Sequence, residues 1–149
     1  MWKITVLFSV SVIVATVATT VYSETIKPIK VSRSEISGLM FERRDATTDT
    51  KDGNTTTDVV TFTSCDMVFQ SGMFKSGPTH ELIADPPGFP YNEFLYFVSG
   101  SATFTSPDGS VLAIHSGEAV TVPKGWVGRF DTDGYTKLYV TYDPAEIKR

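Results

Sequence analysis

The sequence predicts an all-β protein whose strands close into a single barrel or sandwich. From residue 59 onward, short runs rich in Val, Phe, Tyr and Thr recur, and each is bounded by Gly, Pro or Asp. Such a pattern is typical of many short strands joined by tight turns. In the same region no stretch keeps a 3.6-residue apolar rhythm for ten residues, so we expect helices to be few and short.

Turn residues mark where the expected strands stop. The Ser106–Gly109 segment predicts a hairpin, because Pro107 supplies a fixed φ and Gly109 the positive φ that follows. Gly100 is expected to end the strand before it, and Pro123 to end another, because proline cannot donate to a sheet ladder. The expected strands are residues 59–63, 67–75, 79–84, 93–98, 101–105, 111–115, 119–122, 127–131 and 136–142.

Residues 1–23 have the layout of a secretory signal peptide. Lys3 precedes an apolar run over residues 4–18, and small residues follow before an expected cut at Glu24. As a membrane anchor the run is short of the roughly 20 residues that a spanning helix needs, and Ser and Thr interrupt it. We therefore expect a periplasmic or secreted protein with no stable membrane insertion after cleavage.

Removing the leader leaves 126 residues, the usual size of one domain. We expect a polar N-terminal arm over residues 24–58, a barrel over 59–143 and a tail over 144–149. Residues 46–58 are dense in turn formers and predict either a solvated loop or a wide hairpin with its tip at Asp52-Gly53.

Charge and cysteine content exclude some classes of function. Loss of Lys3 with the leader changes the formal net charge from −4 to −5, and no basic stripe is present, which argues against nucleic-acid binding. The single cysteine, Cys65, cannot form an intramolecular disulfide. It lies between apolar stretches with no histidine nearby in sequence, so we expect a buried thiol and not a nucleophile.

Glu93 is the residue that most needs an explanation. Side chains alternate along a strand, so Glu93, Leu95 and Phe97 share one face, and Phe94, Tyr96 and Val98 share the other. A carboxylate at the head of a largely apolar strand is costly to bury unless it has a partner.

The spacing around Glu93 resembles the two-part signature of the cupins, which are small β-barrels that hold a ligand or metal. Six residues separate Glu93 from Gly100, Gly117 follows seventeen residues later, and Pro123 and Gly125 close the second part. The resemblance runs from about residue 69 to 142 and is strongest to the ureidoglycine aminohydrolase-type, DUF861-like subgroup. It implies a double-stranded β-helix, or jelly-roll barrel, with Glu93 pointing inward.

The resemblance also implies a metal site that this sequence lacks. Metal-binding cupins place two histidines shortly before this glutamate and a third in the second part. Here the third position is Gly128, and the first two are Pro87 and Phe89 or, in the other register, Pro86 and Gly88. None of these can ligate, and Glu93 alone cannot hold a first-row divalent ion.

Two histidines remain as substitutes. His80 begins the 79–84 strand and could face inward with Glu93, so these two residues stay as weak metal candidates. His115 lies at a hairpin end and is expected to be solvated. We expect no cofactor, with a divalent metal as the less favoured alternative.

Without a metal, a cation should neutralise Glu93, and Lys137 is the candidate. Lys137 and Tyr139 share a face of the last strand, in a Lys-x-Tyr arrangement that resembles this cupin subgroup. One hypothesis is that Lys137 or Tyr139 reaches Glu93 or a ligand carboxylate; the alternative is a surface lysine beside the barrel mouth. Arg129 is expected to face away from the site.

Aromatic residues should complete a small-molecule pocket or, equally, a plain core. Trp126, Gly128 and Phe130 alternate onto one face, and Phe89 with Tyr91 could form a rim. Glu93 and Lys137 are the best candidates for any catalytic role. The expected ligand-binding residues are Glu93, Tyr91, Trp126, Phe130, Lys137 and Tyr139.

Three functions remain open. The favoured one is a non-enzymatic, exported cupin that binds a small polar ligand. The second is a hydrolase of the ureidoglycine aminohydrolase type acting on a small ureide or other nitrogenous compound, and in the family that activity depends on the missing metal ligands. The third is a structural or interaction module, such as a homodimer paired through an exposed strand edge.

Overall fold

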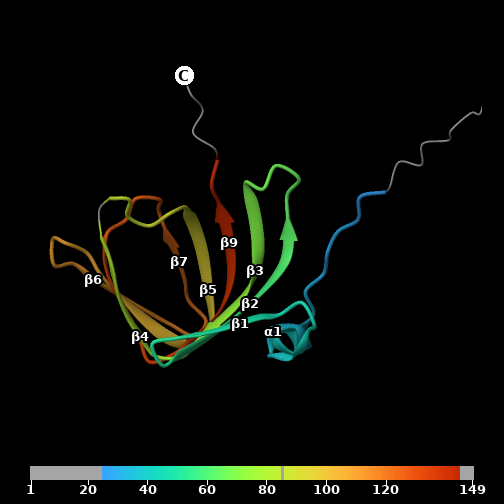
Figure 1. Ribbon diagram of the computed structural model, residues 1–149, viewed down its shortest axis with the longest axis horizontal. Helices are drawn as coiled ribbons and strands as arrows, with labels where there is room; N and C mark the ends of the chain where they lie inside the picture. Colours follow the sequence, from blue (N-terminus) through green and yellow to red (C-terminus); the bar gives the residue numbers. More distant parts are fainter. Residues whose placement is uncertain (1–24, 85, 145–149) are drawn as a thin grey trace, which may run out of the picture.

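The computed structural model describes residues 25–84 and 86–144, and within these ranges the chain is almost entirely antiparallel β-sheet. Figure 1 shows the strands curling into a half-barrel, with β2 and β3 on one side and β4 and β6 on the other. The all-β prediction is confirmed. The predicted leader, residues 1–23, and most of the predicted tail lie outside the described residues. No helix in the described ranges is long and apolar enough to cross a membrane.

Two short helical segments precede the strands. They are α1 (Arg33–Ile36) and the 3₁₀ turn η1 (Leu39–Glu42). The strands of the described ranges are β1 (Thr47–Lys51), β2 (Asn54–Thr63), β3 (Phe69–Ser76), β4 (Thr79–Ile83), β5 (Asn92–Thr105), β6 (Val111–His115), β7 (Ala119–Val122), β8 (Gly128–Thr132) and β9 (Tyr135–Tyr142).

The long strand β5 joins the two sides of the half-barrel. Its first half pairs with β7 and β9, and its second half pairs with β6 and β8, so one strand belongs to both sheets. The change of sheet falls at a bulge between Phe97 and Ser99, next to Gly100, whose φ is +74°. Strands that switch sheets turn the corner at such bulges. Gly100 therefore bends a continuous strand; the prediction that it ends a strand is wrong.

Predicted and observed strands otherwise agree closely after residue 59, except that 93–98 and 101–105 are the two halves of β5. The sequence predicted no strand before residue 59, but the structure has strand residues there. Residues 47–51 and 54–63 form a hairpin whose two-residue turn has φ of +50° at Asp52 and +82° at Gly53. Of the two alternatives for this segment, the hairpin is right and the solvated loop is wrong. The strand β1 was not predicted because all of its residues are exposed, so it has no apolar face whose alternation could indicate a strand.

The apolar residues form two clusters on opposite faces of the β2–β3–β9–β5 sheet. The larger cluster lies inside the half-barrel and includes Leu95, Phe97, Phe104 and Tyr139. The smaller lies outside, where η1 lays Met40 against Val59 and Met73. The α1 segment that precedes η1 begins at a capping box in which Ser32 and Glu35 bond each other's backbone N–H. The segment that contains α1 and η1 therefore covers one patch of the outer sheet face.

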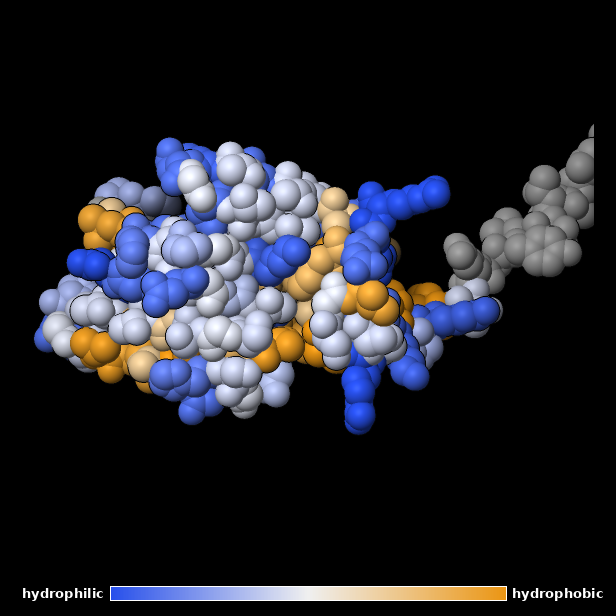
Figure 2. All heavy atoms as spheres, turned by 90° about the horizontal axis from the view of Figure 1, so that it is seen from below, coloured by the Kyte–Doolittle hydropathy of each residue, from blue (hydrophilic) through white to orange (hydrophobic). Residues whose placement is uncertain are grey.

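The surface is mostly polar, as Figure 2 shows for one face, with several small apolar patches among the polar side chains. Cys65 is exposed in the turn between β2 and β3, so the prediction of a buried thiol is wrong. The flanking apolar residues indicated burial. Instead, the chain reverses there through Ser64 and Asp66, which bond the turn backbone.

Candidate functional site

A cavity of about 310 Å³ lies inside the curled sheet. It is lined by side chains from β2, β3, β4, β5, β7, β8 and β9 together with the segment before β5. Its walls combine aromatic rings with a small number of charged and hydroxyl groups. The lining residues are Thr56, Asp58, Gln70, Phe74, Ser76, Thr79, Glu81, Ile83, Phe89, Tyr91, Glu93, Leu95, Phe97, Phe104, Val122, Phe130, Tyr135, Lys137, Tyr139 and Thr141.

Glu93 points into this cavity and pairs with Lys137. The Lys137 Nζ donates to Glu93 Oε1 at 2.9 Å, and the two side chains are only 12% and 5% exposed. Leu95 and Phe97, which share the face of Glu93, are buried, whereas Phe94 and Tyr96 are exposed. The face shared by Glu93, Leu95 and Phe97, predicted from strand alternation, is the buried one, and the inward orientation that the cupin resemblance implied for Glu93 is confirmed. So is the hypothesis that Lys137 reaches Glu93, and the surface-lysine alternative is wrong.

Aromatic rings surround the Lys137 ammonium. Its Nζ lies 5.2 Å from the ring centroid of Phe74 and 5.8 Å from those of Tyr135 and Tyr139. Ring faces attract a cation at such distances. The buried lysine is therefore held by one carboxylate and a set of π faces.

Asp58 and Tyr139 form the second polar pair of the cavity. The Tyr139 phenol donates to Asp58 Oδ1 at 3.0 Å. Burial raises the pKa of the Tyr139 phenol well above its usual range, and the Asp58 charge and hydrogen bond raise it further, so the phenol stays protonated and remains a donor. Burial also raises the pKa of Asp58, against the opposing effects of the Tyr139 bond and the Lys137 charge.

Gly72 makes room for this pair. It faces Tyr139 across the β3–β9 ladder, and a Cβ at Gly72 would lie 2.5 Å from the Tyr139 Oη. Only glycine lets the phenol lie flat across β3 toward Asp58 on β2. Local sequence thus supports a contact between strands far apart in the chain.

Two further tyrosines face the same charges. Burial is the main cause that raises the pKa of both phenols, Tyr135 and Tyr91, and the nearby Glu93 charge raises both further. The pKa of Tyr135 lies well above its usual range. Both phenols are therefore neutral near pH 7 and can donate or accept a hydrogen bond. The cavity offers three neutral phenols beside its charged groups.

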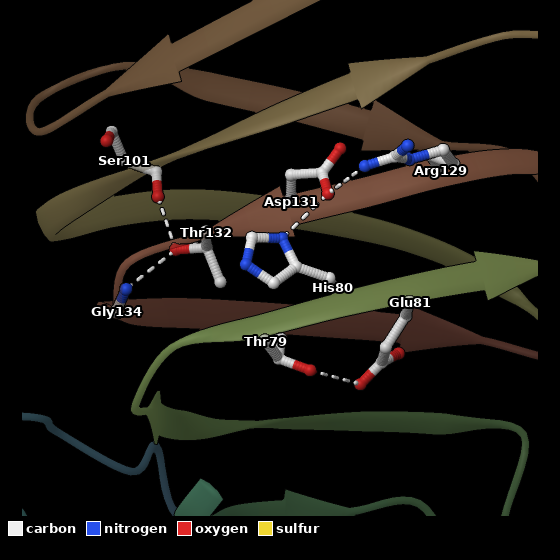
Figure 3. Close-up of polar contacts among 8 residues, drawn as sticks. All are labelled: Thr79, His80, Glu81, Ser101, Arg129, Asp131, Thr132 and Gly134. Atoms are coloured by element: carbon white, nitrogen blue, oxygen red, sulfur yellow. Dashed lines mark hydrogen bonds and ion pairs between the residues drawn. The ribbon is translucent and has the colours of Figure 1, made fainter.

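His80 lies outside this site. Figure 3 shows His80 on the opposite side of β4 from Thr79 and Glu81, with its Nδ1 2.8 Å from Asp131 Oδ1. The side chain is 68% exposed. The hypothesis that His80 faces inward with Glu93 is wrong, because the strand begins at Thr79 and its alternation sends Thr79, Glu81 and Ile83 inward. His115 is exposed at the end of β6, as expected.

The remaining predicted residues divide between wall and support. Phe130 and Tyr91 line the cavity, and Phe89 packs edge-on against Tyr91 at a centroid distance of 5.3 Å. Trp126 does not line it: its ring packs edge-on against Phe104 and its Nε1 donates to Ser106 Oγ. Arg129 faces away, bonded to Asp131 (Figure 3), as predicted. We therefore leave Trp126 out of the candidate site.

The donors present do not fit a divalent metal. Within the described ranges, no three His, Cys, Asp or Glu side chains lie close enough together to hold an ion. Glu93 already has Lys137 as its counter-charge. At position 128 a Cβ would meet the Thr105 carbonyl oxygen and, at 2.7 Å, the Trp126 ring, so a histidine could not stand there without displacing the backbone.

Comparison with known protein families identifies the family of this chain. A profile of the EutQ-like cupin domain matches residues 63–139. The chain belongs to the EutQ-like cupin family. This match covers the strands from β3 to most of β9 and confirms the resemblance to cupins; the jelly-roll description fits the curled sheet. No curated protein matches this EutQ-like cupin.

Solved structures agree on the fold. The Clostridium difficile EutQ protein is 24% identical, with a TM-score of 0.51 over 64% of this chain and 67% of its own. A DUF861-family protein of unknown function from Pseudomonas syringae pv. tomato is 16% identical, with a TM-score of 0.57 over 64% of this chain and 43% of its own. A Rhizobium leguminosarum protein of unknown function is 16% identical, with a TM-score of 0.53 over 80% of this chain and all of its own.

Asp58, Glu81 and Tyr135 are cavity residues that the sequence analysis missed. Asp58 and the strand before it were assigned to the polar arm, although Asp58 directly precedes the buried Val59 and so falls on the opposite face of β2. That alternation was a usable signal. Glu81 would have followed from placing Thr79 inward, which no local pattern specifies.

We expect Asp58→Asn to keep or slightly raise stability at pH 7. The folded-state pKa of Asp58 is raised, so its ionised form opposes folding above that pKa, and the penalty disappears as pH falls through it. Asparagine can still accept from Tyr139. The gain should stay below about 1 kcal/mol because Asp58 is only half-buried and solvent screens it.

Urea unfolding of the wild type and Asp58→Asn at pH 7 and pH 5 measures this effect. The stability difference between the two proteins should shrink at the lower pH. A variant destabilised by more than about 1 kcal/mol at pH 7 would instead show that the carboxylate has a structural role.

Proposed function

We propose that this EutQ-like cupin binds a small polar organic molecule in its barrel cavity and does so without a metal ion. The observation that carries the proposal is the buried Glu93–Lys137 pair on the wall of an aromatic-lined cavity. Apolar side chains of similar volume often stabilise a core as well as such a pair does, so stability alone does not account for these buried charges. Retention of the pair beside an open volume favours a ligand-binding role.

The cavity has the composition expected of a small-molecule site. Its volume of about 310 Å³ is at the lower end of the roughly 300–1,000 Å³ typical of ligand pockets. Apolar and aromatic walls with a few convergent polar groups are typical of such pockets. The convergent groups are Asp58, Glu93, Lys137 and Tyr139, which come from three different strands.

The hydrolase alternative has weaker support. A ureide-cleaving cupin of the kind suggested by the sequence resemblance needs a metal-activated water, and the donors described above do not supply that site. The interaction-module alternative does not explain why charged groups converge inside the half-barrel. A binding protein accounts for both observations.

A screen of small metabolites by ligand-observed NMR tests the proposal, using a library with equal numbers of cationic, neutral and anionic compounds. We expect at least one ligand that Thr56→Trp, on the cavity wall, weakens at least tenfold. Thr121→Trp, exposed on β7, is the matched control and should bind normally. Failure to find any ligand sensitive to Thr56→Trp would refute the proposed function.

Elemental analysis separates this function from the metal-dependent hydrolase. Protein purified without chelators should contain far less than one equivalent of any first-row divalent metal, and EDTA should leave its unfolding midpoint unchanged. A stoichiometric metal whose removal lowers the midpoint would favour the hydrolase instead.

We further propose that the protein acts outside the cytoplasm. Support comes from the signal-peptide layout of residues 1–23, which lie outside the described structure. Mass spectrometry of the protein recovered from an exporting host should give a polypeptide that begins near Glu24. Recovery of the intact chain from the cytoplasm alone would contradict export.

A further inference from the structure

We propose that the ligand is a small organic cation, such as a primary amine or a quaternary ammonium compound, with Asp58 as its counter-ion. This inference rests on the proposed function and specifies the ligand's charge. It follows from how charges and rings are distributed on the cavity wall.

The cavity wall carries an excess of negative charge. Three carboxylates line it, from Asp58, Glu81 and Glu93, and among the described lining residues the one cationic side chain is Lys137. Lys137 is committed to Glu93 at 2.9 Å. Because that pair is neutral overall, the remaining charge facing the cavity comes from Asp58 and, nearer the edge, the exposed Glu81.

Among the described residues Asp58 has a hydrogen-bond partner but no ion pair, and the nearby Lys137 charge only partly offsets its burial. Its side-chain hydrogen bond comes from the neutral phenol of Tyr139, which can satisfy one lone pair but not the charge. Burying half of a carboxylate that has no ion-pair partner costs free energy, and burial raises the pKa of Asp58 despite the Lys137 charge. A bound ammonium group would pair with the Asp58 carboxylate and remove that cost, so a cation should bind more tightly than a neutral molecule of the same shape.

The rings that complete the wall suit the same ligand. Phe74, Tyr135 and Tyr139 already place their faces within 5.2–5.8 Å of the Lys137 ammonium. Phe89 and Tyr91 add two more rings to the lining. Aromatic faces beside a carboxylate are a recurring way to bind ammonium compounds. An anionic ligand would meet the same rings and two carboxylates that Lys137 does not neutralise.

Matched probes of equal shape test the charge preference directly. One set is choline, 3,3-dimethylbutan-1-ol and 3,3-dimethylbutanoate; the other is butylammonium, butan-1-ol and butanoate. Isothermal titration at pH 7.5 and low salt gives the dissociation constant of each. We expect at least one cation to bind about tenfold or more tightly than its neutral and anionic counterparts.

Two variants, Asp58→Asn and Asp131→Asn, then show whether the preference for a cation arises inside the cavity. Both variants remove one negative charge, but Asp131 lies on the outer face with His80 and Arg129 (Figure 3). Asp58→Asn should weaken the cation about tenfold and change the neutral analogue by less than twofold. Asp131→Asn should leave both unchanged.

Several results would overturn the inference while leaving the proposed function intact. These are a neutral or anionic probe that binds as tightly as its cation, cation binding that Asp58→Asn does not weaken, or a metabolite screen whose cavity ligands are all neutral or anionic. Absence of any cavity ligand in that screen would instead refute the proposed function itself.

Discussion

Gly100→Ala should lower the free energy of unfolding by about 3–5 kcal/mol, enough to prevent folding of a domain of ordinary stability. The backbone at Gly100 has φ of +74°, which costs a non-glycine residue roughly 1–2 kcal/mol. In addition, an added Cβ would clash with the Gly134 carbonyl oxygen and lie 2.7 Å from the Tyr135 Cα. Backbone atoms cannot move aside as a flexible side chain can.

The clash matters because Gly100 is where β5 passes from one sheet to the other. The turn between β8 and β9 is fastened at this point: Thr132 Oγ1 donates to the Ser101 carbonyl and accepts from the Gly134 N–H (Figure 3). Pushing the turn away would separate β9 from β5. Since β9 carries Lys137 and Tyr139, the candidate site would be lost with it.

Gly117→Ala is the matched control. Its φ is +87°, yet nothing lies within 4 Å of the added Cβ, so it should cost only the backbone term of about 1–2 kcal/mol. Urea unfolding, or soluble yield and circular dichroism where a variant does not fold, measures both. Equal losses for Gly100→Ala and Gly117→Ala would contradict the crossing-point explanation.

Lys137→Met should lower the free energy of unfolding by about 3–5 kcal/mol, because it leaves the Glu93 carboxylate buried without a counter-charge. Glu93 and Lys137 are 5% and 12% exposed, so water cannot replace the lost partner. Lys124→Met is the control: it breaks an ion pair with Asp143 of similar length whose side chains are 47% and 48% exposed. That loss should be between about 0 and 1 kcal/mol.

The double variant Glu93→Met/Lys137→Met separates charge from packing. Because it removes both charges and keeps similar volumes, it should recover most of the stability lost in Lys137→Met. It should nevertheless fail to bind the cavity ligand if the pair has a binding role. A Lys137→Met protein with unchanged stability and unchanged ligand binding would contradict the role that we assign to this pair.

Local patterns predicted much of the fold. Alternation along residues 93–98 correctly put Glu93, Leu95 and Phe97 on one face, because side chains alternate between the two faces of any strand. The hairpin over Ser106–Gly109 followed from turn chemistry that is equally local. Exceptions occur where the partner strand decides: Gly100 bends β5 instead of ending it, and threonine-rich β1 exists because β2 pairs with it.

Errors about single side chains have the same origin. Cys65 lies between apolar residues in sequence, but it occupies a turn that exposes it. His80 seemed able to join Glu93, yet a one-residue difference in register decides between the two faces of β4. Trp126 packs edge-on against Phe104 and does not line the cavity. This placement depends on packing between β5 and the segment before β8.

The sequence by itself determined an all-β fold from its turn residues and strand alternation, and its resemblance to cupins implied the inward carboxylate at Glu93 and the missing histidines. Only the tertiary structure decided which groups meet that carboxylate. Lys137 lies 44 residues from Glu93, and Tyr139 lies 81 residues from Asp58. Contacts at such separations depend on strand order and register, which are set by the packing of the whole sheet and not by any local segment.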